Sequence, residues 1–174
     1  MHSAEPLPHF VDDYLAFLYE VHPTGATMDG VHAHDDLVED YRRTAVDTHV
    51  SALAGFARRL DAIATTHLPA REQVEHAIIH ANIRARQFEL EDVRSWERNP
   101  HSYADIIASS LATQAIFTYA PETDRARRVL SKLRQVPRLI EAARDNIKDP
   151  PAIFVKVGID TFRGAMSLDR KSVV

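Results

Sequence analysis

The sequence of 174 residues lacks cysteine altogether and contains only five glycines. Without cysteine, disulfide bonds, thiolate catalysis and cysteine-ligated zinc sites are excluded. No segment alternates β-branched with polar residues, as the strands of a sheet do, and few glycines are present for tight turns. A sheet-rich fold is therefore not expected.

Net positive charge and a long apolar run are lacking too. The formal net charge is −4 with histidine neutral, which argues against nucleic-acid binding because that binding needs clustered Lys and Arg. The least charged stretch, residues 106–121, is shorter than the ~20 apolar residues that cross a bilayer. Residues 1–8 have neither the basic start nor the apolar core of a secretory signal. We therefore expect a cytoplasmic protein with no nucleic-acid or membrane partner.

What the sequence does contain is helical periodicity. Hydrophobic residues make up 45% of the chain and charged residues 26%, which is typical of a soluble globular protein. Apolar residues recur at spacings of three and four, which predicts an all-α array of about six to seven antiparallel helices. The expected helices cover residues 10–21, 45–67, 69–96, 100–118, 122–136, 139–147 and 152–165.

Single residues predict where these helices begin and end. Thr44 is expected to cap the second helix, and Asn99, followed by Pro100, the fourth. Pro137 is expected to kink or split a helix, because its ring clashes with the preceding turn. Residues 23–41 have no apolar period, so we expect a long connecting loop, of the kind that is usually functional or flexible.

His76 and His80 form the pattern that most resembles a metal site. Two histidines four apart on a helix face the same way, as two zinc ligands must. Zinc proteases carry a catalytic Glu directly after the first histidine, where this chain has Ala77. The predicted apolar face of this helix lies elsewhere and consists of Val74, Ile78, Ala81, Ala85 and Phe88. We therefore interpret the pair as part of a solvated polar face, with a metal site as the alternative.

The predicted loop 23–41 is rich in histidine and aspartate. These residues are His32, His34, Asp35, Asp36 and Asp40. Clustered His and carboxylate groups can bind a divalent cation. Asp side chains equally suit a loop in which they bond the backbone at turns and helix caps. The loop is thus a second candidate site, with a structural role as the favoured interpretation.

A third candidate is the junction of two predicted helices, where Arg98, Asn99 and Tyr103 could line a polar cleft. Capping by Asn99 and packing of the Tyr103 ring explain the same residues structurally. The basic residues between Arg125 and Arg138 are expected to form a solvated face. The sequence contains no Gly-rich phosphate loop, nucleophile elbow or HExxH motif. The residues alone thus predict a soluble helical domain without a complete catalytic site.

Short motifs recur in a specific order along most of the chain. They are Pro23, Ala26-Thr27, Gly30, His32, His34-Asp35-Asp36-Leu37, Asp40, Glu97-Arg98-Asn99-Pro100, Tyr103, Tyr119-Ala120-Pro121, Arg134, Val136-Pro137, Ala143, Asn146 and Pro150-Pro151. Together they resemble a bacterial family known as domain of unknown function 885.

The resemblance implies a largely helical protein grouped with zinc-dependent peptidases, which hydrolyse an amide bond with a zinc-activated water. The zinc motif that it implies is a His-Glu pair followed by Gly-His-His in the C-terminal half, and this sequence has no such pattern. We therefore expect an N-terminal part that is inactive alone, with zinc only in the full-length parent. Its expected partners are the missing C-terminal half and a peptide-like substrate. The candidate cleft residues are His32, Asp35, Asp36, Arg98, Asn99 and Tyr103.

The end of the chain leads to a further expectation. Residues 169–174 do not continue the apolar pattern and match the translation of a common sequencing adapter. We therefore expect a family region at residues 1–168 and a non-native tail at 169–174. The alternative to a truncated hydrolase is a self-sufficient helical module that binds a partner protein or a metal, through His76 and His80 or the His32 loop.

Overall fold

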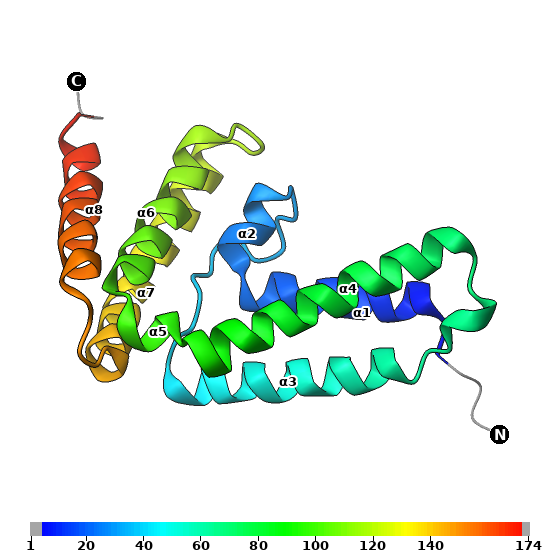
Figure 1. Cartoon of the computed structure of the whole chain (residues 1–174). Helices are drawn as coiled ribbons and strands as arrows, with labels where there is room; N and C mark the ends of the chain where they lie inside the picture. The colour runs from blue at the N-terminus through cyan, green and yellow to red at the C-terminus, as the bar shows by residue number, and fades with distance from the viewer. Residues whose placement is uncertain (1–4, 172–174) are drawn as a thin grey trace. The chain divides into compact units, whose positions relative to one another are not determined.

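Every regular element in the described part of the chain is a helix, which confirms the all-α prediction. The computed structural model describes residues 5–171, with side chains up to residue 164 (Figure 1). The helices are α1 (Leu7–Val21), α2 (Pro23–Met28), α3 (Arg43–Asp61), α4 (Ala70–Phe88), α5 (Ser95–Arg98), α6 (Pro100–Ile116), α7 (Glu122–Asn146) and α8 (Ala152–Lys171). A 3₁₀ turn, η1 (Thr65–His67), precedes α4, and a π turn, η2 (Glu89–Val93), follows it.

The chain folds into two units. Unit 1 contains the described residues up to Leu18 together with Thr44–Arg94, so it holds most of α1, then α3, α4 and η2. Unit 2 contains Tyr19–Arg43 and the chain from Ser95 onward, so it holds α2 and the helices from α5 to α8. No helix among the described residues is long and apolar enough to cross a membrane.

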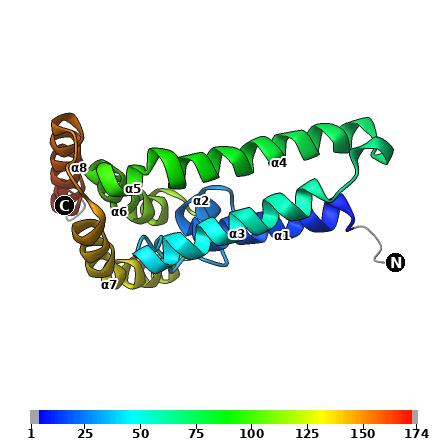
Figure 2. The ribbon, with the colours of Figure 1, turned by 60° about the horizontal axis from the view of Figure 1, so that its bottom comes forward.

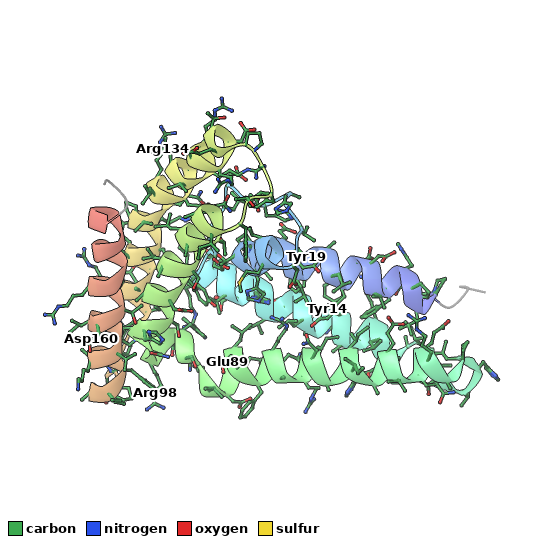
Figure 3. The ribbon with its side chains drawn as sticks, turned by 90° about the horizontal axis from the view of Figure 1, so that it is seen from above. Tyr14, Tyr19, Glu89, Arg98, Arg134 and Asp160 are labelled. Atoms are coloured by element: carbon green, nitrogen blue, oxygen red, sulfur yellow. The ribbon has the colours of Figure 1, made fainter. Side chains whose placement is uncertain are left out.

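Unit 1 is built around aromatic side chains of α1 and α3. The rings of Phe10 and Tyr14 meet the ring of Phe56 edge to face, with centroids 5.8 and 5.2 Å away. Leu53 and Leu60 on α3 are fully buried in the core. Tyr14, labelled in Figure 3, donates its hydroxyl to Oδ1 of Asn82 on α4 at 2.7 Å. Burial of such side chains stabilises the unit by about 1.5–3 kcal/mol each.

Helix α4 buries a different face from the one that the sequence predicts. Val74, Ile78 and Phe88 are 59%, 63% and 59% exposed. The buried side chains are instead Ile79 and Ile83. Large apolar residues lie on two faces of this helix, so the periodicity of the sequence does not show which face is buried. The contacts of α4 with α1 and α3 decide which face that is. The predicted apolar face was therefore wrong.

The predicted helix 69–96 also ends early. At its end, η2 replaces the regular pattern, and the amide of Arg94 donates to the carbonyl of Glu89 at 2.8 Å. Arg94 then adopts a left-handed conformation with φ 53°. Glycine is the usual residue for such a helix stop, and no glycine or proline marks this one. The sequence therefore gave no signal for the break before α5.

Unit 2 is centred on α6, which packs against both α7 and α8 (Figure 2). Tyr103 and Ile107 of α6 and Leu139 of α7 form its buried core, with Phe162 of α8 packed against it. Asn99 caps α6 by accepting the amide of His101 at 3.1 Å, as predicted.

Helix α7 continues through Pro137 without a break, so the expected split into two helices was wrong. Proline inside a helix removes one hydrogen bond and costs roughly 3 kcal/mol. Burial of Leu139 and Ala142, which follow the proline on the same helix, offsets part of this cost.

Two further boundaries differ from the prediction. The expected loop 23–41 begins with the six-residue helix α2, which Pro23 starts. Helix α3 begins at Arg43, so Thr44 lies inside it and does not cap it. The predicted tail falls partly within α8, which runs to Lys171; its last residues, 172–174, lie outside the described residues.

Candidate functional site

Asp35 is the centre of a buried polar cluster in unit 2. Its side chain is 1% exposed. It accepts the hydroxyl of Thr27 at 2.6 Å, the guanidinium Nη1 of Arg128 at 2.7 Å and the ring Nδ1 of His32 at 3.0 Å. Thr27 belongs to α2 and Arg128 to α7, so the carboxylate joins the His32 loop to two helices.

The local sequence explains how Asp35 reaches this place. Helix α2 ends at Met28, and Gly30 follows with φ +82°, a conformation that residues with a side chain rarely adopt. The chain thereby reverses, and the amide of Val31 donates to the carbonyl of Ala26 at 2.8 Å. The turn directs the following residues back past Thr27.

The cluster keeps Asp35 ionised. Burial by itself would raise the pKa of Asp35, but hydrogen bonds of Thr27 and Tyr119 and the charges of His32 and Arg128 outweigh it and lower the pKa. Arg128 also lies over the Tyr119 ring, 5.3 Å from its centroid. The carboxylate is therefore an acceptor only.

This acceptor fixes the His32 ring. An ionised carboxylate cannot donate a hydrogen bond, so in the bond between Asp35 and His32 the hydrogen lies on Nδ1 of His32. In the neutral ring, the free lone pair is then on Nε2. The ring stacks on Tyr119 with centroids 3.8 Å apart and 5° between the planes. The side chain remains 35% exposed. The site thus presents an imidazole of fixed tautomer and orientation.

Two further ionisable residues, Glu39 and Lys132, are buried in the same unit. Glu39 accepts the amide and the hydroxyl of Thr24 at 3.1 and 2.9 Å, and burial raises its pKa. Lys132 is fully buried, and its Nζ has no hydrogen-bond partner among the described residues. Burial lowers the pKa of Lys132, against the opposing charges of Glu39 and Asp35.

The basic face predicted between Arg125 and Arg138 is therefore only partly solvated. Arg128 turns inward because it pairs with the buried carboxylate of Asp35, and Lys132 is fully buried. Sequence reasoning missed both residues. A one-dimensional pattern shows a basic run but not the acidic loop, nearly a hundred residues earlier, that faces it.

The remaining residues of the loop have other contacts. Asp36 is exposed, and its backbone carbonyl accepts Nε2 of Gln135 at 2.7 Å. Asp40 pairs with Arg42. The structure therefore gathers His32 and Asp35 from this candidate set into one buried cluster.

At the α5–α6 junction, where the sequence predicts a cleft, the side chains pack together and are hydrogen-bonded to one another. The Tyr103 hydroxyl donates to the carbonyl of Trp96 at 2.6 Å and accepts Nδ2 of Asn146 at 3.1 Å. Asn99 caps α6, whereas Arg98, labelled in Figure 3, is exposed. These contacts give Asn99 and Tyr103 structural roles.

In unit 1, His76 and His80 line a groove of about 620 Å³ together with Asp61. Nε2 of His76 lies 3.1 Å from the carbonyl oxygen of Leu60. Nε2 of His80 lies 3.7 Å from Oδ1 of Asp61. His80 is exposed and His76 is half-buried, because the His76 side of α4 lies next to Leu60 at the end of α3.

Sequence reasoning missed a further cluster in unit 1. Donor atoms of Glu5, His9 and Asp13 all lie within 4.8 Å of one another. Their spacing of four residues is the signal that could have found them. Arg59 bonds both carboxylates and lies over the rings of Phe10 and Phe56, at 5.3 and 5.2 Å from their centroids. A cation of the protein thus already neutralises this cluster.

The helices and the Asp35 cluster define an all-α protein that has a buried polar centre in unit 2. The model of a family described as "Bacterial protein of unknown function (DUF885)" matches residues 23–173. The chain belongs to this family, domain of unknown function 885, as the sequence motifs indicated.

One solved structure shares the fold. It is described as a "putative lipoprotein of unknown function" from Shewanella oneidensis, and it is 23% identical with a TM-score of 0.87. The match covers 94% of this chain and 30% of that one, so this chain spans less than a third of the relative's length. No curated protein matches the sequence significantly. The expected cytoplasmic location stays a prediction.

Proposed function

We propose that this chain is one helical part of a larger hydrolase of the zinc-dependent peptidase type, and that it does not complete an active site alone. Family membership and the coverage of 30% of a longer relative support this proposal. The zinc motif that the resemblance implies does not occur in the sequence. No residue of this chain is therefore assigned to that metal, and no catalytic step is derived through it.

Within the larger protein, we assign the Asp35 cluster to the wall of a substrate cleft. The observation that carries this assignment is a buried carboxylate whose oxygen lies 3.0 Å from Nδ1 of a partly exposed imidazole. A buried charge is costly unless it is paired, so the bonds from Thr27 and Arg128 make a stable support for His32. Orienting carboxylates serve the same purpose beside catalytic histidines.

The chemistry of the exposed atom suggests the ligand. In the neutral ring, Nε2 of His32 is a hydrogen-bond acceptor, and the ring lies flat against that of Tyr119. A peptide offers N–H groups that can donate to this nitrogen. We therefore propose that the His32 side chain positions a peptide-like substrate, without performing the bond-breaking step.

Peptide binding to the isolated chain tests this role. A blocked trialanine peptide is titrated into the labelled chain, and the nuclear magnetic resonance signals of the His32 and Tyr119 rings are followed. We expect weak saturable shifts at both rings and no hydrolysis of a fluorogenic peptide with or without zinc. In His32→Ala the shift at the Tyr119 ring disappears, whereas Met28→Ala, at a 61% exposed position on α2, keeps the shifts at both rings.

Two results would contradict the proposal. Shifts that are absent in the parent chain, or a Tyr119 shift that persists unchanged in a folded His32→Ala variant, exclude the cleft-wall role. Peptide hydrolysis by the isolated chain that His32→Ala abolishes would instead show that the chain holds a complete site.

A further inference from the structure

We propose that Asp61, His76 and His80 form a zinc site at the end of the α3–α4 hairpin in unit 1. The site is independent of the peptide-cleft proposal, which concerns unit 2. Helix α3 ends at Asp61, and the chain then turns through η1 and returns as α4 (Figure 1). This return brings the carboxylate and the two imidazoles to one groove of about 620 Å³.

The bond of His76 prepares its ring for a metal. A backbone carbonyl can only accept, so the contact with Leu60 places the hydrogen on Nε2 of His76. The lone pair of the neutral ring then lies on Nδ1. Histidine ligands almost always donate their other ring N–H to a carbonyl or carboxylate, which sets the tautomer and raises the basicity of the ligand. The Leu60 carbonyl supplies this outer bond.

The second and third ligands already lie at a suitable separation. Zinc binds nitrogen and oxygen ligands at about 2.0–2.2 Å, so two ligands of a tetrahedron stand about 3.4 Å apart. Nε2 of His80 and Oδ1 of Asp61 are 3.7 Å apart. Their side chains are 49% and 64% exposed, so both can rotate toward the ion. Water completes the fourth position.

The Glu5–His9–Asp13 cluster is the competing candidate. Its donor atoms are closer together, within 4.8 Å, than those of the Asp61 groove. However, Arg59 is bonded to both of its carboxylates, and a metal would have to displace this guanidinium from between Phe10 and Phe56. No such displacement is needed at the Asp61 groove, where the mixture of two imidazoles and one carboxylate favours zinc over magnesium or calcium.

Calorimetric titration of the untagged chain with zinc tests the site. We expect saturable binding of one ion, and a loss of affinity of more than about tenfold in both His76→Ala and His80→Ala. Asp61→Asn should weaken binding less, because an amide oxygen is a poorer ligand. His67→Ala, at an exposed position on η1, is the matched control and should bind as the parent chain does. Magnesium should not compete.

A measurement on the unaltered chain removes any dependence on variant folding. Zinc should shift or broaden the side-chain resonances of His76 and His80 while leaving those of His67 and His9 unchanged. Absence of saturable binding overturns the proposal. So does binding that His9→Ala abolishes and His76→Ala does not, because the ion would then occupy the Glu5–His9–Asp13 cluster.

Discussion

His49 on α3 is a buried histidine whose protonation links the stability of unit 1 to pH. Its ring packs edge to face on Phe17, with centroids 5.3 Å apart. Burial, with a smaller contribution from the charge of Arg86, lowers the pKa of His49 from 6.5 to about 4. The folded chain therefore holds this ring neutral over a pH range in which the unfolded chain protonates it.

This difference predicts acid sensitivity. Below pH 6.5 His49 is protonated in the unfolded state, whereas in the folded state it stays neutral down to about pH 4. The folding free energy therefore becomes less favourable as pH falls through this range. At pH 4.5 the loss amounts to about 2–3 kcal/mol. In urea unfolding at pH 7 and 4.5, His49→Phe should lose that much less stability than the parent chain. His67→Phe should behave as the parent, and an equal loss in His49→Phe would refute the assignment.

The two buried carboxylates of unit 2 respond to pH in opposite directions. The pKa of Asp35 is lowered, so its contribution to stability is present above the unfolded pKa and is lost as pH falls. The pKa of Glu39 is raised by burial, so its contribution is lost as pH rises through the folded pKa. Charge pairing, and not burial alone, decides the sign.

At the scale of elements, the contact of α6 with α8 depends on a glycine. A Cβ atom added to Gly158 would lie 3.2 Å from the backbone nitrogen of His101, where α6 begins. The backbone cannot move aside as a side chain can. Gly164 on the same helix has no atom within 4 Å of the corresponding position. Helix α8 therefore contains one glycine at a close contact with α6, Gly158, and one glycine without such a contact, Gly164, which serves as the control.

Alanine substitution should separate these two glycines. Alanine favours a helix interior by about 0.8–1.0 kcal/mol over glycine, so Gly164→Ala should stabilise the chain in urea unfolding. In Gly158→Ala the gain should be cancelled or reversed, and Gly158→Leu should destabilise by about 1–3 kcal/mol through overpacking. Equal stabilisation by both alanines would show that the helices do not approach as closely as described.

Helix boundaries and helix faces were predictable to different degrees. Asn99 with Pro100 fixed the start of α6 because capping is a local property of the chain. The buried face of α4 and the continuity of α7 through Pro137 were predicted wrongly, because each depends on neighbouring helices. Within the candidate site, the hydrogen bond between His32 and Asp35 could have been predicted from the sequence, because the two residues lie three positions apart in one loop.

At the scale of the whole molecule, apolar surface remains exposed. In unit 1, a groove of about 470 Å³ lies between α1 and α4, lined mainly by apolar side chains such as Leu15 and Ile78. Val74 and Ile78 are 59% and 63% exposed beside it. Contiguous apolar surface of this kind favours association in water.

We therefore expect the isolated chain to self-associate as its concentration rises, as seen by sedimentation velocity. The double variant Val74→Lys with Ile78→Lys should remain monomeric at concentrations where the parent associates. Met28→Lys, which replaces an apolar side chain on α2 that is 61% exposed, should associate like the parent. A parent chain that stays monomeric with a sharp melting transition would contradict the expectation.

The sequence by itself determined the helical class, the start of α6 at Asn99 and Pro100, the family and the lack of a zinc-peptidase motif. These features are local or compositional, so neighbours in space do not alter them. Only the tertiary structure decided that Lys132 is buried and that Arg128 bonds Asp35 across 93 residues of chain. The reason is physical: whether a charge is buried depends on the opposite charge that faces it, and periodicity does not record that partner. The prediction that the chain holds no complete site thus rests on the sequence, whereas the orientation of the His32 ring follows from the fold.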